Sequence, residues 1–329
     1  MLREQVLAEI RRVVPFDFHV WLLTDPETSV GAAPLADVPP PILPLLPRLI
    51  GLKYLTAVNR WTGLPATAAT LAEATGGDLS RSRLWREMLG HHGVVDMASC
   101  VFRDRFGCWG FLDLWRTSGG RFTPPESAYL TGINQVVTRA LRRCQANTFV
   151  VRAADRPRRP GPVVLLLSPD LQVLGQTPET LEYLRVLVPP AAGHAPIPAN
   201  AYNVGAQLLA VEAEVDRNPP SARVHLSDGL WVSLRAARIG DAGSAGERNI
   251  AVTIEETAPA ERVSLFGRAY GLSPREIELL GHLTTGLDTR ELAGRMFLSQ
   301  HTVQDHLKSV FSKTATRSRG ALLSRALGT

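Results

Sequence analysis

The chain has few cysteines and no long run of apolar residues. Three cysteines in 329 residues are an odd number and give no disulfide framework. The longest purely apolar run spans residues 163–167, far short of the ~20 residues that cross a bilayer, and is typical of a buried strand. Residues 1–12 include acids and have no continuous apolar core, so we expect no signal peptide. These absences predict a cytoplasmic protein that does not enter a membrane.

The chain also lacks the short motifs of common enzyme classes. It has no G-x-S-x-G elbow, no G-x-x-x-x-G-K-[ST] phosphate loop, no H-E-x-x-H and no G-x-G-x-x-G. The His91-His92 pair has no second cluster at metal-ligand spacing, so we expect no zinc site. We therefore expect no enzymatic activity, and the sequence identifies no cofactor.

What the sequence does contain is enough apolar material for several packed cores. Hydrophobic residues make up 45% and charged residues 20%, which excludes a disordered chain, and the length suits two or three domains. Residues 152–162 are polar, basic and rich in proline, which is typical of a linker between domains. The predicted domains are an α+β sensor domain at 1–150, a linker at 151–161, a second α+β domain at 162–256, a connecting helix at 257–271 and an all-α domain at 272–329.

The first 256 residues predict mixed strands and helices. In the first domain we expect helices at 2–14, 84–89 and 123–147, a strand at 16–24, and a hairpin at 96–115 with its turn near 103–107. The segment 39–47 holds too many prolines for a long helix. In the second domain we expect strands at 163–168, 171–175, 222–226, 229–239 and 249–255, with helices at 178–188 and 200–216.

Three successive helix starts near the C-terminus carry capping signals. Ser273 is followed by proline and by Glu276, which together predict a capping box. Asp288 and Glu291 repeat the pattern. Ser299 caps a third helix only about two residues after the second helix ends. A short helix, a tight turn and a longer helix predict a helix-turn-helix.

The third of these helices has two different faces. Val303, Leu307 and Val310 recur at i, i+4 and i+7 and should face the core. The remaining surface carries polar residues: Gln300, Gln304, Asp305, Lys308 and Ser312. Such a face fits the DNA major groove, where glutamine pairs with adenine, aspartate accepts from cytosine, and lysine reaches guanine or phosphate. An ordinary solvated face is the alternative, and the capped starts with the tight turn favour DNA binding.

These segments resemble the LuxR-type DNA-binding domain over about 55 residues. The resemblance rests on Leu272-Ser273-Pro274-Arg275-Glu276, Thr289-Arg290-Glu291-Leu292-Ala293, residues 298–307, Phe311-Ser312-Lys313 and Ser318-Arg319. It implies that the third helix reads the major groove, with Gln304, Asp305 and Lys308 facing bases. It also implies phosphate contacts from Thr302, Lys313 and Arg319. A fourth helix would support dimerisation through Leu322, Leu323 and Leu327.

Two positions depart from the family pattern. The family often has glycine or asparagine where this chain has Ala315, and a left-handed conformation there would strain an alanine. Ala321 stands where an acid or glutamine would complete a capping box with Ser318. Both departures should loosen the fourth helix, and with it the dimer, without removing DNA binding.

The preceding segments resemble sensor domains. Val14-Pro15-Phe16-Asp17, residues 107–115 and Phe122-Thr123-Pro124-Pro125-Glu126 look like a GAF-type domain. Strand order, Leu167-Ser168-Pro169-Asp170 and residues 227–231 resemble a PAS-type domain. The resemblance implies a small-molecule effector, although folds of this kind host many ligands or none.

The first domain is rich in tryptophan, which suits a ligand pocket with a few polar groups. Packing of the aromatic residues in a core is the alternative at each position. The candidate pocket residues are His19, Trp21, Trp61, Trp85, Trp109, Phe111 and Asp113.

Together these features predict a sensory transcriptional regulator that binds double-stranded DNA as a homodimer. The connecting helix would carry the signal from the sensors to the DNA-binding domain. Two alternatives stay open. One is a sigma-factor-like module that docks on RNA polymerase, and the other is a sensor domain that turns over its ligand.

Overall fold

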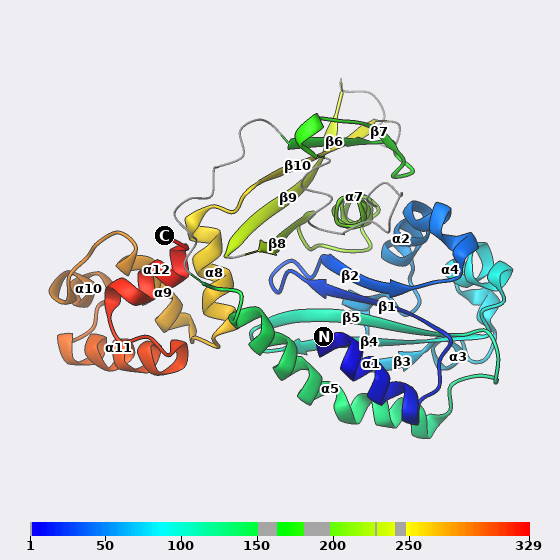
Figure 1. The fold of residues 1–329 in the computed structure, drawn as a ribbon, viewed down its shortest axis with the longest axis horizontal. Helices are drawn as coiled ribbons and strands as arrows, with labels where there is room; N and C mark the ends of the chain where they lie inside the picture. The colour runs from blue at the N-terminus through cyan, green and yellow to red at the C-terminus, as the bar shows by residue number, and fades with distance from the viewer. Residues whose placement is uncertain (1, 151–162, 181–197, 228, 241–247) are drawn as a thin grey trace. The chain divides into compact units, whose positions relative to one another are not determined.

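The chain forms two compact units. The computed structural model describes residues 2–150, 163–180, 198–227, 229–240 and 248–329. The first unit comprises residues 1–139, 161–224 and 233–255; the second comprises residues 140–160, 225–232 and 256–329 (Figure 1). The predicted linker at 151–161 and residues 181–188 of a predicted helix lie outside the described residues.

The first unit begins with an antiparallel sheet whose strands, in the described residues, run in the order β2-β1-β5-β4-β3. Its strands are β1 (Phe18–Thr24), β2 (Gly31–Asp37), β3 (Ala68–Thr70), β4 (Asp96–Asp104) and β5 (Gly107–Arg116). Its helices are α1 (Leu2–Val13), α2 (Leu46–Leu55), α3 (Leu71–Ala74), α4 (Arg83–Glu87) and α5 (Pro124–Ala146). Figure 1 shows α1 and α5 on one side of this sheet. The predicted first helix, first strand, hairpin and long helix are confirmed.

The proline-rich segment forms more helix than its composition suggests. Residues Pro40–Leu45 form a 3-10 helix, and α2 follows directly. Pro47 lies in the first turn of α2, where a missing N–H costs no intrahelical hydrogen bond. Strand β2 was not expected either, because it contains a proline and no β-branched residue.

A second sheet repeats this strand order in the described residues, as β7-β6-β10-β9-β8. It consists of β6 (Val163–Leu167), β7 (Val173–Gln176), β8 (Ser221–Ser227), β9 (Leu230–Ile239) and β10 (Asn249–Glu256), with α7 (Ala199–Glu212) between its second and third strands. The five predicted strands and the predicted helix at 200–216 are confirmed. Helix α7 is buried on almost every side and packs against α2 and β2.

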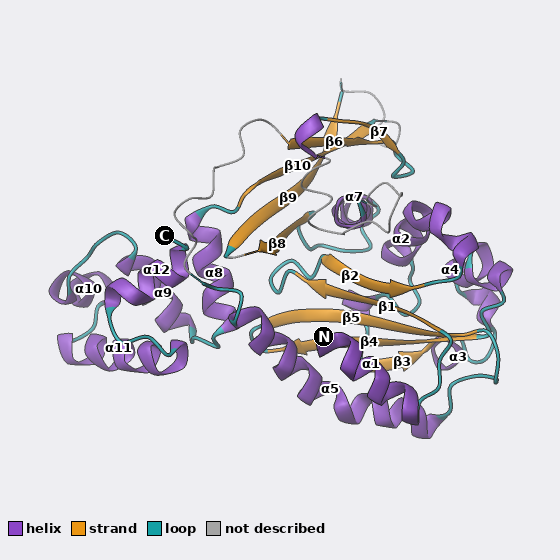
Figure 2. Cartoon of the chain, viewed as in Figure 1, coloured by secondary structure: helices purple, strands orange, loops and turns teal. Residues whose placement is uncertain are grey.

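The described C-terminal residues of the second unit are helical, as Figure 2 shows. The helices are α8 (Pro259–Ala269), α9 (Pro274–Leu283), α10 (Thr289–Met296), α11 (Gln300–Thr314) and α12 (Arg319–Leu327). The capping boxes predicted at Ser273 and Asp288 are present, and Ser299 Oγ accepts the backbone N–H of Thr302. The local hydrogen-bonding chemistry of the sequence therefore sets these helix starts.

Helix α8 belongs to the core of the second unit. It packs against α9 and α12, and Phe266 is fully buried. Phe149 stacks on Trp231 at 5.1 Å and meets Phe266 edge to face. Arg262 of α8 donates to the carbonyl of Gly229 at 2.7 Å. The residues that follow α5 and those at the start of β9 therefore pack in the same unit as the C-terminal helices.

Two of the helices end in the left-handed conformation without glycine. Phe297 has φ 55° after α10, and Ala315 has φ 52° after α11. Ala315 therefore does adopt the conformation that would strain an alanine. At α12, Ser318 caps Ala321 N–H alone, because an alanine side chain cannot return the hydrogen bond.

The apolar residues of α12 are not all available for the dimer contact that the resemblance implies. Leu322 is fully buried and α12 packs on α8, so that side chain serves the domain's own core. Leu323 and Leu327 are half-buried. The sequence pattern showed the apolar character of this helix but could not show that α8 covers part of it.

Candidate nucleic-acid interface and ligand cavity

Helices α10 and α11 and the three residues between them form the predicted helix-turn-helix. Phe297 ends α10 in the left-handed conformation, and Ser299 caps α11. Val303, Leu307 and Val310 are buried, as the spacing predicted, and both α9 and α10 contact α11. The opposite face of α11 is thereby directed away from the domain core.

The three residues expected to face bases lie together on that exposed face. Gln304, Asp305 and Lys308 are all exposed. Lys308 Nζ lies 3.3 Å from Asp305 Oδ1, and His301 Nε2 lies 3.5 Å from Asp305 Oδ2. Exposed pairs of this kind contribute little stability, so the side chains can exchange partners at small cost.

The three residues expected to contact phosphates already have partners within the chain. Thr302 Oγ1 lies 2.9 Å from Ser299 Oγ. Arg319 donates to Thr289 Oγ1 at 2.6 Å, and Lys313 Nζ lies 2.6 Å from Glu276 Oε2. Their role at phosphates stays a prediction, and the structure adds an internal role for each.

Glu276 joins α9 to α11. Its carboxylate accepts hydrogen bonds from Ser273 N, Ser309 Oγ and Lys313 Nζ. Burial raises the pKa of this carboxyl, but the hydrogen bonds outweigh burial and lower the pKa to about 2. Glu276 therefore stays ionised at neutral pH and fixes the orientation of the candidate recognition helix.

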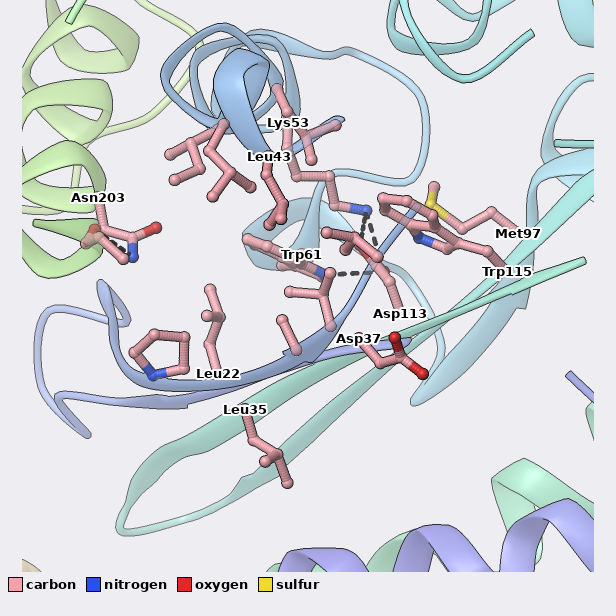
Figure 3. A pocket seen from close by; sticks show the side chains of 18 of the residues that line it. Leu22, Leu35, Asp37, Leu43, Lys53, Trp61, Met97, Asp113, Trp115 and Asn203 are labelled. Carbon is pink, nitrogen blue, oxygen red and sulfur yellow. Dashed lines mark hydrogen bonds and ion pairs between the residues drawn. The ribbon is translucent and has the colours of Figure 1, made fainter. Parts of the chain in front are cut away.

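A cavity of about 530 Å³ lies in the first unit, on the face of the first sheet that α2 covers (Figure 3). Its size falls in the range of small-molecule sites. Its walls come from β1, β2, β5, α2 and α7, with further residues from β4, α4 and the 3-10 turns. The lining is mainly aliphatic: Val20, Leu22, Pro34, Leu35, Ala36, Val38, Leu43, Leu46, Leu49, Ile50, Leu84, Met97 and Ala199, together with Asp37, Lys53, Trp61, Asp113, Trp115 and Asn203.

A buried ion pair forms one wall of the cavity. Lys53 Nζ lies 3.0 Å from Asp113 Oδ2, and both side chains are 4% exposed. Asp113 Oδ1 also accepts from Trp61 Nε1 at 3.0 Å and from Ser99 Oγ at 2.6 Å. Burial lowers the pKa of Lys53, while Asp113 favours its charged form. The Lys53 ammonium additionally donates to Asn59 O, so the charged groups of this wall are well compensated.

Of the seven predicted pocket residues, two line this cavity. Trp61 and Asp113 are in its wall, and Phe111 stacks beneath Trp61 at 4.8 Å. His19, Trp21, Trp85 and Trp109 are not among its lining residues.

Strand register explains which face of β1 meets the cavity. Val20 lies opposite Asp113 and Leu22 opposite Phe111, so the even-numbered residues share the cavity face. Trp21 points to the other face, where it stacks on Phe102. The alternation was visible in the sequence, but the face that carries the cavity was not.

The other candidate aromatic residues have local roles. Trp85 Nε1 donates to Val94 O at 2.8 Å, and Trp109 Nε1 donates to Asp104 Oδ1 at 3.0 Å. His19 is half-buried, and burial lowers its pKa. These contacts fit the packing alternative for single residues of this domain.

Sequence reasoning missed Lys53 and Asn203 as cavity residues. Lys53 could have been noticed as a single cation in an otherwise apolar helical turn, Leu49–Tyr54. Asn203 lies on α7, whose packing against α2 depends on tertiary structure. Its sequence neighbourhood gives no signal that it reaches the first sheet.

Metal-ligand groups and membrane-spanning helices were searched for in the part of the chain that the structure describes. No three His, Cys, Asp or Glu side chains there form a group that could hold a metal ion. No helix among those residues is long and apolar enough to span a bilayer. All three cysteines are free, with Cys100 and Cys108 buried. Burial raises the pKa of the Cys100 thiol to about 12, which disfavours a reactive thiolate.

The three capped helices, the short turn and the exposed polar face define a helix-turn-helix domain of the kind found in transcription regulators. Residues 271–326 match the family described as "Bacterial regulatory proteins, luxR family". The C-terminal segment is therefore a LuxR-type helix-turn-helix domain, as its motifs predicted.

Two curated proteins are similar to parts of the chain. "Probable HTH-type transcriptional regulator GfsR" of Streptomyces halstedii is 35% identical over 85 residues, which is 23% of this chain and 35% of the relative. "Transcriptional regulatory protein LnrK" of Bacillus subtilis (strain 168) is 40% identical over 48 residues, 15% of this chain and 22% of the relative. The chain thus spans about a third or less of the length of these relatives.

Solved structures show a distant likeness. SdiA of Escherichia coli is 12% identical with a TM-score of 0.34, over 99% of this chain and 89% of that one. A structure titled as a VqmA-Ligand-DNA complex of Vibrio cholera is 19% identical with a TM-score of 0.23, over 52% and 84%. The assignment of the C-terminal domain rests on its residues and on the family match.

Proposed function

We propose that this protein is a sequence-specific DNA-binding transcriptional regulator whose activity is modulated by a small molecule in its sensor region. The observation that carries the proposal is the exposed polar face of α11 on a LuxR-type helix-turn-helix domain. On this face Gln304 is proposed to pair with adenine, Asp305 to accept from cytosine, and Lys308 to reach guanine or phosphate. Thr302, Lys313 and Arg319 are proposed to contact phosphates from the flanks of this face.

The protein is proposed to bind as a homodimer. Two recognition helices would then enter successive major grooves, with half-site centres about 34 Å apart. The half-buried Leu323 and Leu327 of α12 remain candidates for the dimer contact. The relatives' names support a role in transcription, and that support extends only to the 15–23% of the chain that matches them.

We infer that the first two domains are GAF-like and PAS-like sensors. Their sheets share one strand order, and a cavity of small-molecule size, lined by residues of both domains, lies against the first sheet. A signal can shift DNA binding only if it has different affinity for two arrangements of the protein. Helix α8 would carry such a shift, and because it is packed into the second unit it would move together with α9 and α12.

The test is selection of bound DNA from random duplexes with the full-length protein at several salt concentrations. We expect recovery of an inverted repeat and an affinity that falls as salt rises. Recovery of no sequence preference, with or without added effector candidates, would contradict the proposal. Binding that requires RNA polymerase would favour the sigma-factor-like alternative.

A further inference from the structure

Arg262 of α8 joins three segments of the second unit. Its side chain is 4% exposed. Nη1 donates to Gly229 O at 2.7 Å, and Nη2 donates to Arg325 O at 3.3 Å and to Val150 O at 3.4 Å. The three carbonyls belong to the turn between β8 and β9, to the last turn of α12 and to the segment that follows α5. A guanidinium suits this position because its five N–H donors lie in one plane and can serve several acceptors at once.

The contact between Arg262 and α12 depends on residues of both helices. The last carbonyls of a helix carry partial negative charge, which favours a cation at its C-terminal end. Gly328 ends α12 in the left-handed conformation, with φ 76°. A Cβ at this position would lie 3.0 Å from three guanidinium atoms of Arg262. Glycine therefore allows the end of α12 to approach the guanidinium closely.

Aromatic packing holds the end of α5 and the segment after it against α8. The Arg262 guanidinium lies 5.1 Å from the centroid of the Phe149 ring. Tyr270, directly after α8, donates from Oη to Ala146 O at 3.0 Å. Its ring centroid lies 4.5 Å from that of Phe266. These contacts add an apolar component to the hydrogen bonds of Arg262.

The segments that meet α8 are continuous with elements of the sensor region. Residues 146–150 end α5 and follow it, and residues 229–231 lead into β9; both α5 and β9 have residues in each of the two units. The helix-turn-helix domain is therefore held to these segments by side-chain contacts, in addition to the backbone that precedes α9.

We propose that Arg262 determines the separation of the two half-sites that a dimer of this protein recognises. The inference rests on the proposed function, since it concerns the proposed dimer. A domain held only by a flexible backbone can reach half-sites at many separations, whereas side-chain contacts with neighbouring segments restrict its position. Each added base pair moves one half-site along the duplex and rotates it by about a tenth of a turn. Domains in fixed positions should therefore accept one separation, and Arg262 acts on it as a positioning residue through α12.

The test uses the full-length protein and duplexes with two copies of the selected half-site, at separations that differ by one base pair. The unchanged protein should prefer one separation over its neighbours by about tenfold or more, and Arg262→Met should reduce this preference to about threefold or less. Methionine keeps an aliphatic side chain but has no N–H donor. The motif within each half-site should stay the same, because the exposed face of α11 is not altered.

Gly328→Ala loosens the same contact from the side of α12. Its Cβ would displace the guanidinium, so this variant should relax the preferred separation as Arg262→Met does. Gly286→Ala is the matched control. Gly286, shortly after α9, is also left-handed, with φ 83°, but a Cβ there would meet no described atom within 4 Å beyond its chain neighbours. The control should keep the preference, and Gly328→Ala stays decisive if Arg262→Met fails to fold.

One preferred separation retained in both variants would overturn the proposal, as would equal affinity of the unchanged protein for several separations. Relaxation in Arg262→Met without relaxation in Gly328→Ala would overturn the contact with α12 as its cause.

Hydrogen exchange on the protein without DNA provides a second readout. Both substitutions should speed exchange of the amides at 146–150 and 229–231 together with those at 322–328, and Gly286→Ala should not. Faster exchange confined to the substituted helix would overturn the linkage, whatever the duplex selection recovers. A protein that selects an operator motif but shows no such linkage would keep the proposed function and lose this role of Arg262.

Discussion

Two lysine–aspartate pairs occupy opposite surroundings in this molecule. Lys53 and Asp113 lie in the cavity wall with side chains 4% exposed, whereas the side chains of Lys308 and Asp305 on α11 are 73% and 54% exposed. Their separations are similar, at 3.0 and 3.3 Å. The two pairs therefore differ in burial. The buried pair, Lys53 with Asp113, holds a cavity wall in place, whereas Lys308 and Asp305 can replace their contact with each other by contacts with DNA.

Breaking the buried pair should have the largest effect. Asp113→Ala leaves the Lys53 ammonium buried without its carboxylate and should lower the free energy of unfolding by about 3–5 kcal/mol at pH 7. The loss should shrink as pH rises toward the ordinary lysine pKa, because neutral Lys53 no longer needs a partner. Urea unfolding followed by circular dichroism measures both effects.

Asp305→Ala is the matched control for the buried pair. It removes an exposed partner and should change the same free energy by less than about 1 kcal/mol. Equal effects of the two substitutions would refute the distinction between the pairs.

The Glu276 network lies between these extremes, since a buried carboxylate meets the partly exposed Lys313. The pKa of Glu276 is lowered to about 2, so its stabilisation is present at neutral pH and is lost as pH falls from the ordinary glutamate range toward 2. Glu276→Gln should remove on the order of 3 kcal/mol at neutral pH, and the difference from the unchanged protein should vanish near pH 2. Thermal unfolding from pH 6 to pH 2 tests this dependence.

Glu278→Gln serves as control on the same helix. Glu278 pairs with Arg275, and both side chains are exposed. This variant should have the same free energy of unfolding as the unchanged protein across the pH range. A decrease as large as that of Glu276→Gln would show that burial of the Glu276 carboxylate does not account for its effect.

Relief of backbone strain after α11 should have a smaller effect of opposite sign. Ala315→Gly should raise the free energy of unfolding by ~1 kcal/mol, because glycine adopts the left-handed conformation without a Cβ clash. Ala321→Gly, within α12, should instead lower it by roughly 0.5–1 kcal/mol. Denaturant unfolding of both variants gives the comparison, and a loss in Ala315→Gly would contradict it.

The exposed lysine should show almost no effect on folding and a clear effect on DNA. Lys308→Ala should lower the slope of log affinity against log salt by about one if the ammonium contacts a phosphate. Arg275→Ala removes a comparable exposed cation with an acidic i+3 neighbour on α9, and should leave the slope unchanged. Fluorescence anisotropy with the selected operator measures both slopes. A reduced slope in both variants would indicate a general charge effect.

The contrast between the two regions also explains what the sequence could predict. The helix-turn-helix depends on signals within a few residues, such as Ser273 with Glu276 and Asp288 with Glu291, so its helices and its exposed face follow from local chemistry. The strands of the second sheet and β1, β4 and β5 of the first were likewise visible as apolar patterns, whereas β2 and β3 were not. Cavity residues come from elements far apart in the chain: Lys53 and Asp113 are 60 positions apart, and Asn203 lies on the helix of another sheet.

The alternation of side chains along a strand defines two faces but does not show which face lines the cavity. For this reason Trp21 was expected in the pocket and Leu22 was not. The cavity lies on the face that α2 and α7 line, and no local pattern shows which face that is. The placement of phosphate contacts was similarly incomplete, because Lys313 and Arg319 have internal partners that a helical pattern cannot reveal.

A comparison of the DNA motifs selected by two proteins tests whether the exposed face of α11 reads bases. Duplex selection is performed in parallel with the unchanged protein and with Gln304→Ala, at the same salt concentration. If Gln304 reads a base, the variant should lose preference at one base pair in each half-site and keep the rest of the motif, because the phosphate contacts remain. Recovery of the same motif from both proteins would contradict it.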